Sequence, residues 1–105
     1  MKNCVIYCTV PNEFNANLIA NSLVEEKLAA CVNIIDNITS VYNWDGGVQT
    51  DKELLLIIKT QMACFDSVKE KILSLHEYTL PEIIALPIEK SSEDYQNWVI
   101  RETKC

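Results

Sequence analysis

The five cysteines and the single histidine are the side chains of this chain best suited to metal binding or nucleophilic chemistry. A thiolate is a soft ligand that suits Cu(I), and a neutral imidazole is the commonest metal ligand. Cys8 lies near the end of a strand-like run, and His76 follows an amphipathic segment. Each also has a structural interpretation, because most free cysteines are small buried hydrophobes and a helix-terminal histidine bonds the last carbonyl groups.

The spacing of the cysteines argues against the two commonest cysteine scaffolds. Their number is odd and no two have CxxC spacing, which indicates neither a disulfide framework nor a structural zinc site. Residues 1–10 carry no small-residue cleavage site of a signal peptide. We therefore expect reduced thiols in a cytosolic protein. The five positions are Cys4, Cys8, Cys31, Cys64 and Cys105.

Enzymatic and nucleic-acid functions receive little support from the sequence. A Cys8–His76 nucleophilic pair is conceivable, but the chain has no evident oxyanion hole and no GxGxxG, P-loop or GxSxG motif. We therefore expect that this protein is not an enzyme. The net charge of −6, from 15 acidic and 9 basic residues, argues against a nucleic-acid surface. This charge is compatible with cation binding and equally with simple solubility.

Three charged residues, Glu53, Lys59 and Glu82, are embedded in apolar segments. A charge in such a setting is costly unless it is paired. One interpretation is an ion pair between strands or between subunits. The other is a polar cleft between subunits that binds a small ligand. The aromatic residues that could wall this cleft, or simply pack an interface, are Tyr42, Trp44 and Tyr78.

The first half of the chain predicts a strand, a helix and a long hairpin. Residues 3–10 are β-rich, and Asn12 is a plausible N-cap for a helix that runs to about Ala30. Residues 31–44 alternate as in a half-buried strand, with Val32, Ile34, Ile38, Tyr42 and Trp44 at one parity. Residues 36–37 interrupt this pattern as a β-bulge would. A turn at residues 45–47 leads into a strand over 48–60.

The second half predicts a helix, a strand and a final helix. Phe65, Val68, Ile72 and Leu75 have the spacing of an amphipathic helix. Residues 82–88 indicate a short buried strand. Ser91 and Asp94 resemble a capping box that opens a helix through Trp98.

The order of these elements predicts one α+β domain over residues 1–105, with a ferredoxin-like βαββαβ sandwich, a long central hairpin and a C-terminal helix. Right-handed crossovers place both crossover helices on one face of the sheet. The other face is then bare, although residues 54–58 read LLLII. No apolar run is long enough to cross a membrane. We expect this face to be covered by other copies of the chain.

Several segments resemble the CutA family, the divalent-cation-tolerance proteins. The specific ones are EKLAACVN at 26–33 and the Trp-x-Gly turn at 44–46, and the similarity covers essentially the whole chain. It implies a homotrimer akin to the PII signalling proteins, a link to copper or another divalent cation, and no established reaction. The remaining matching residues are Cys8, Thr9, Pro11, Ser40, Tyr42, Glu53, Lys59, Thr60, His76, Tyr78, Pro81, Glu82, Tyr95 and Trp98.

The resemblance implies Cys8 and His76 as metal ligands, but the chain departs from the family pattern beside the histidine. Some members carry a second histidine where this chain has Leu75, and a proline where it has Glu77. The missing imidazole weakens a Cys-His-His copper site. The carboxylate of Glu77 is a hard ligand that does not replace a soft one for Cu(I), so it shifts the expected ion toward Cu(II), Zn(II) or no metal. The alternative function is a PII-like signalling or scaffold trimer that binds a small metabolite or partner protein in the subunit cleft. The cleft residues would be Tyr42, Trp44, Glu53, Lys59, Tyr78 and Glu82.

Overall fold

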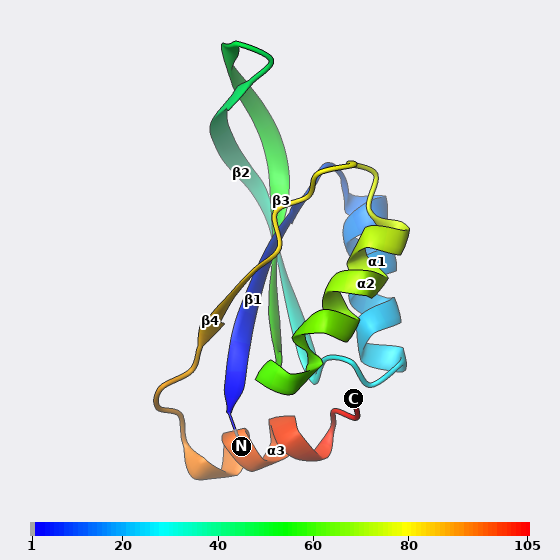
Figure 1. Ribbon diagram of the computed structural model, residues 1–105, viewed down its shortest axis with the longest axis vertical. Helices are drawn as coiled ribbons and strands as arrows, with labels where there is room; N and C mark the ends of the chain where they lie inside the picture. Colours follow the sequence, from blue (N-terminus) through cyan, green and yellow to red (C-terminus); the bar gives the residue numbers. More distant parts are fainter. Residues whose placement is uncertain (1) are drawn as a thin grey trace.

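A computed structural model describes residues 2–105 and shows a four-stranded antiparallel sheet with two helices on one face (Figure 1). The strand order is β2-β3-β1-β4, which is the ferredoxin-like order and confirms the predicted fold. The elements are β1 (Asn3–Val10), α1 (Glu13–Glu25), β2 (Cys31–Trp44), β3 (Gly47–Gln61), the 3-10 helix η1 (Met62–Cys64), α2 (Phe65–Leu75), β4 (Ile84–Pro87) and α3 (Glu93–Arg101).

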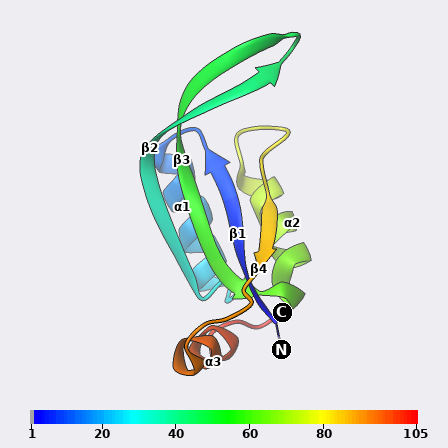
Figure 2. The same ribbon diagram turned by 90° about the vertical axis from the view of Figure 1, so that its left-hand side faces the viewer.

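The core lies between the sheet and the two helices α1 and α2. Alternate residues of β1 point into it, so Cys4, Ile6, Cys8 and Val10 are all 0% exposed. Ala16, Ile19 and Leu23 of α1, and Val68 and Ile72 of α2, complete the cluster from the helix side. Figure 2, turned by 90°, shows the opposite face of the sheet in front of the two helices. In the described residues, no helix is long and apolar enough to cross a membrane.

Local backbone geometry sets where the helices begin and end. The Asn12 side chain accepts a 2.8 Å hydrogen bond from the Asn15 amide, which confirms the predicted N-cap. Helix α1 ends at Glu25 rather than near Ala30, because Lys27 takes a left-handed conformation with φ 59. The capping box is wrong, since α3 is capped at Ser92 with no side-chain hydrogen bond, and the helix continues to Arg101.

The predicted bulge in β2 is confirmed, and it reverses the faces of the strand. Ile35 pairs with Leu55 and Ile38 pairs with Glu53, so residues 36 and 37 together stand opposite Leu54. Before the bulge, Ile34 pairs with the buried Leu56 and faces the helices. After it, even-numbered residues lie on the open face. The prediction that Val32, Ile34, Ile38, Tyr42 and Trp44 share one face is therefore wrong.

The open face of the sheet is apolar, as the sequence predicts. Ile84 and Leu86 pair with Tyr7 and Val5 on this face and are 49% and 45% exposed. The expectation of a buried final strand is thus wrong within one chain. The β2–β3 hairpin continues beyond the helices (Figure 1), and its turn is formed by Asp45 and Gly46 at φ 53 and 79. The chain is 44 Å along its longest axis.

The prediction of reduced thiols is wrong for two of the cysteines. Cys64 at the end of η1 forms a disulfide with Cys105, and their Cα atoms are 5.3 Å apart. Sequence spacing does not indicate this pair. The two cysteines meet because the fold places the segment after α3 beside η1 (Figure 1). Cys4 and Cys8 are free and buried, and Cys31 is free and half-buried.

Candidate functional site at the base of the hairpin

The end of β1 brings the two predicted metal ligands to one carbonyl group. His76 Nε2 lies 2.8 Å from the Thr9 carbonyl oxygen, and the Cys8 thiol approaches the same oxygen at 3.7 Å. The Tyr78 amide donates to His76 Nδ1 at 2.9 Å. This pattern assigns a neutral imidazole with its proton on Nε2. Both ring nitrogens are therefore engaged by the backbone, and a metal would have to displace one of these bonds.

Cys8 is a protonated thiol in this environment. Burial raises its pKa to about 12, and the negative charges of Glu82 and Glu53 act in the same direction. Its side chain is 0% exposed and lies on the helix-covered face of the sheet. Since the thiolate is the form that binds Cu(I), these surroundings disfavour a copper(I) site at Cys8.

Carboxyl and phenol groups gather where the hairpin leaves the body of the sheet. We call Tyr42, Asp51, Glu53, Tyr78 and Glu82 the acidic–aromatic cluster. The Tyr42 hydroxyl donates to Asp51 Oδ2, and this bond raises the pKa of Tyr42 to about 12. Burial raises the pKa of Tyr78, with further contributions from the charge of Glu53 and a hydrogen bond to it. The cluster thus offers oxygen atoms and negative charge.

Glu53 is the buried member of this cluster. It is 7% exposed, and its negative charge contributes to the raised pKa of Tyr78. The ion pairs formed within residues 2–105 are Lys27–Glu102 at 3.7 Å and Lys71–Glu26 at 2.6 Å. None involves Glu53, so a pair between strands of one chain is not formed. A partner from another subunit stays a prediction.

Two predicted cleft residues lie away from the cluster. Lys59 pairs with Cys31 at the other end of β3, and its Nζ is 4.0 Å from the Cys31 sulfur. It lies six positions along the strand from Glu53, which corresponds to roughly 20 Å. Trp44 lies at the tip of the hairpin and is 54% exposed. Neither contributes to a common site within one chain.

Asparagines of α1 hold the loop that carries His76 and Tyr78. Asn15 is 1% exposed, donates to the Leu75 carbonyl at 3.0 Å and accepts from the Glu77 amide at 3.2 Å. The Glu77 carboxylate accepts from Asn12 Nδ2 at 3.1 Å. Glu77 is therefore engaged at the start of α1. The sequence identified Asn12 only as an N-cap and did not indicate Asn15 or Asp51, although counting register from the turn would have placed Asp51 near Tyr42.

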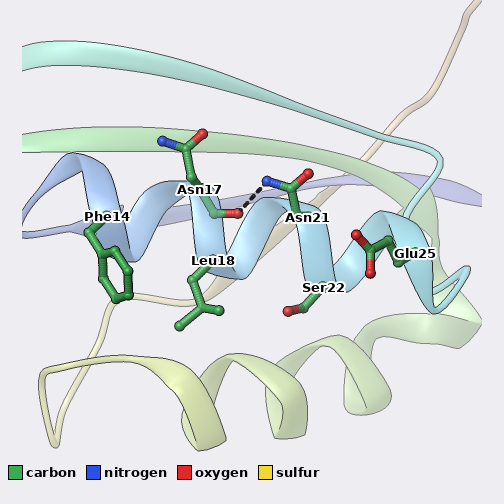
Figure 3. A pocket seen from close by; sticks show the side chains of 6 residues that line it. All are labelled: Phe14, Asn17, Leu18, Asn21, Ser22 and Glu25. Atoms are coloured by element: carbon green, nitrogen blue, oxygen red, sulfur yellow. Dashed lines mark hydrogen bonds between the residues drawn. The ribbon is translucent and has the colours of Figure 1, made fainter.

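One chain alone does not assemble a metal site. Within residues 2–105, no three His, Cys, Asp or Glu side chains converge closely enough to hold an ion. With a protonated Cys8 and both His76 nitrogens bonded, the Cys8–His76 pair does not fit Cu(I). A shallow groove runs along α1, on the helix-covered side of the sheet (Figure 3). It is lined by Phe14, Asn17, Leu18, Asn21, Ser22 and Glu25.

The fold and site define a class of small ferredoxin-like proteins with an overlong hairpin, a bare apolar sheet face and an acidic–aromatic cluster. Residues 4–102 match the family model described as CutA1 divalent ion tolerance protein. The chain is 50% identical over 99 residues to the divalent-cation tolerance protein CutA of Thermus thermophilus, covering 94% of this chain and 96% of that one. The chain belongs to the CutA family. The family description concerns ion tolerance and names no reaction.

A plant relative and a solved structure agree with this assignment. The chloroplastic CutA protein of Arabidopsis thaliana is 50% identical over 100 residues, which cover 95% of this chain and 55% of that protein. The crystal structure of CutA1 from Oryza sativa superposes with a TM-score of 0.97 at 47% identity, covering 99% of this chain and 95% of that one. The chain thus spans nearly all of the Thermus relative and about half of the Arabidopsis one.

Proposed function

We propose that the chain acts in divalent-cation tolerance as a homotrimer that binds a divalent cation at the acidic–aromatic cluster, with ligands completed by a neighbouring subunit. The observation that carries this proposal is Glu53, a 7% exposed carboxylate with no ion-pair partner within residues 2–105. A buried carboxylate is costly unless a cation or several donors compensate it. A divalent ion would supply that compensation.

The bare sheet face supports self-association in this proposal, and the number of three subunits is what the family resemblance implies. It carries apolar side chains from all four strands, and those of β4 are about half exposed in one chain. Monomeric proteins rarely leave a contiguous apolar face of this kind in water. Packing this face against other copies would also bring the base of one hairpin near a neighbour.

The donor set favours a hard or borderline cation over Cu(I). Asp51, Glu53 and Glu82 offer carboxylate oxygens, which suit Mn(II) and, with nitrogen ligands, Cu(II) or Zn(II). Cys8 and His76 remain candidate ligands only if metal binding removes the thiol proton and displaces a backbone bond of the imidazole. The copper link implied by the family resemblance is therefore retained as Cu(II).

Calorimetry with Cu(II), Zn(II), Mn(II) and Cu(I) tests this assignment. We expect Glu53→Gln, which preserves shape and removes charge, to weaken divalent binding at least tenfold. Cys8→Ser and His76→Ala serve as comparison variants and should retain most of the affinity. If Glu53→Gln binds as tightly as the wild type while Cys8→Ser loses binding, the site lies at the thiol and the proposal is wrong.

A second candidate function is a PII-like signalling or scaffold trimer whose cluster binds a small cationic metabolite or a basic segment of a partner. The observation that favours it is the pair of tyrosines, Tyr42 and Tyr78, beside Asp51 and Glu53, because aromatic faces and carboxylates together bind organic cations. Binding of an organic amine that Mn(II) does not displace would favour this function. We also propose a cytosolic location, which cell fractionation would test.

A further inference from the structure

The disulfide lies outside the acidic–aromatic cluster, at the opposite end of the sheet. It joins η1, where Cys64 is 1% exposed, to the segment that follows α3, where Cys105 is exposed. The two residues are 41 positions apart in sequence. Their Cα separation of 5.3 Å lies within the usual disulfide range.

Non-covalent contacts bring these two cysteines together independently of the bond. Thr103 is 7% exposed, and its hydroxyl accepts from Gln61 Nε2 and donates to the Val99 carbonyl, both at 2.8 Å. The Lys104 amide donates to the Lys27 carbonyl at 2.8 Å. Residues 102–105, which we call the C-terminal segment, are thus docked between the end of β3 and the α1–β2 loop. Docking holds Cys105 beside Cys64 and raises the effective concentration of one thiol at the other.

Two of the other three cysteines are poorly placed for oxidation. Cys4 and Cys8 are both 0% exposed, and burial raises the pKa of each thiol. Reaction with a disulfide requires access and thiolate character. Cys31 is free and half-buried, with Lys59 Nζ 4.0 Å from its sulfur, so it can take up a glutathione adduct but is not part of the Cys64–Cys105 bond. Formation of the protein disulfide should therefore be selective for Cys64 and Cys105.

We infer that Cys64 and Cys105 form a reversible thiol–disulfide modification site whose co-substrate is a low-molecular-weight disulfide of the glutathione class. The docking of the C-terminal segment and the contrasting exposure of residues Cys64 and Cys105 carry this inference. It does not rest on the proposed cation function.

The exposure difference sets the order of the reaction. The accessible Cys105 thiolate attacks one sulfur of oxidised glutathione, forms a mixed disulfide and releases one glutathione thiolate. The Cys64 thiolate then attacks the Cys105 sulfur, closes the protein disulfide and releases the second glutathione. Each cysteine loses one proton and one electron, and oxidised glutathione is reduced to two thiols. Excess reduced glutathione reverses both steps.

Closing this bond should change the mobility of the C-terminal segment. In the dithiol form, the segment is held by non-covalent contacts, among them the Thr103 and Lys104 hydrogen bonds and the exposed Lys27–Glu102 ion pair. In the disulfide form, it is also covalently joined to η1. The Lys104 amide, bonded to Lys27, is the direct reporter of this difference.

The experiment equilibrates the full chain in glutathione buffers from fully reduced to fully oxidised, followed by acid quench, alkylation and peptide mass spectrometry. We expect Cys64 and Cys105 to become joined in one cross-link while Cys4 and Cys8 stay reduced. Hydrogen exchange at Lys104 should slow at least tenfold on oxidation. Absence of the cross-link in excess oxidised glutathione, or equal exchange in the two forms, would overturn the inference.

Three variants test the reaction order. Cys64→Ser should accumulate a glutathione adduct on Cys105, because the resolving thiol is missing. Cys105→Ser should give little adduct on the 1% exposed Cys64. Cys31→Ser is the matched control and should leave the cross-link unchanged. Equal adduct yields on Cys64 and Cys105 would contradict the assigned order.

Discussion

At the residue scale, Cys8 and His76 show how far a side chain's chemistry depends on its neighbours. Sequence and resemblance nominated both as metal ligands, and the structure brings both to the Thr9 carbonyl. Residue type could not predict that the Tyr78 amide donates to His76 Nδ1, nor that the charges of Glu53 and Glu82 help to raise the pKa of the Cys8 thiol. These features arise from the loop between α2 and β4, whose path is set by Asn12 and Asn15 of α1.

The buried thiol of Cys8 predicts a loss of stability at alkaline pH. Its pKa is raised from 9.0 to about 12 in the folded chain, so above pH 9 only the unfolded chain releases this proton. The free energy of unfolding should therefore fall as the pH rises from 9 toward 12. Urea midpoints measured across this range provide the test.

Cys8→Ala is the control for this prediction. Tyr42, whose pKa is also raised to about 12, contributes a decline of the same sign. The variant should consequently retain part of the pH dependence and show a shallower slope than the wild type. Identical slopes in the two proteins would show that Cys8 titrates normally in the folded state.

At the element scale, hydrophobic patterns and local signals predicted every strand and every α-helix, although the capping box that indicated α3 was wrong. The limits arise where the backbone departs from the regular repeat. The bulge at residues 36–37 shifts β2 by one residue, so Ile34 and Ile38 point to opposite faces despite equal parity. Lys27 at φ 59 ends α1 before the apolar pattern stops. The bulge and the early end of α1 both depend on local backbone conformations that the hydrophobicity pattern does not specify.

The turn of the hairpin predicts a measurable cost for a β-carbon at Gly46. This residue has φ 79, and no heavy atom lies within 4 Å of the position that a β-carbon would occupy. The penalty of Gly46→Ala is thus conformational and should be about 1 kcal/mol. Chemical unfolding at fixed protein concentration measures it. Gly47→Ala is the matched control, since its φ is not positive, and an equal cost at both positions would contradict the conformational explanation.

At the scale of the whole molecule, the open sheet face and the disulfide have different origins in the sequence. The apolar face could be predicted, because two right-handed crossovers leave one side of the sheet without helices. The Cys64–Cys105 pair could not, because it depends on where α3 returns the chain. The acidic–aromatic cluster could be predicted only in part. Its charged residues were recognisable, but the separation of Lys59 and Trp44 from Glu53 required the three-dimensional register.

The trimer proposed for this chain predicts that single changes on the open face dissociate it. Leu86→Asp introduces a charge at a 45% exposed apolar position of β4 that assembly would bury, and burial of an unpaired charge is costly. Trp44→Ala at the hairpin tip should weaken assembly to a smaller extent. Sedimentation velocity over a dilution series should show a trimer for the wild type and a monomer for Leu86→Asp.

Phe14 provides the matched control for this experiment, since it is apolar and 73% exposed but lies on α1, on the helix-covered side of the sheet. Phe14→Asp changes exposed apolar surface and charge in the same way as Leu86→Asp, on the opposite face. If both variants remain trimeric, the sheet face does not form the interface. If both dissociate, added charge alone is responsible. Dissociation of Leu86→Asp alone assigns assembly to the face that the crossover helices leave open.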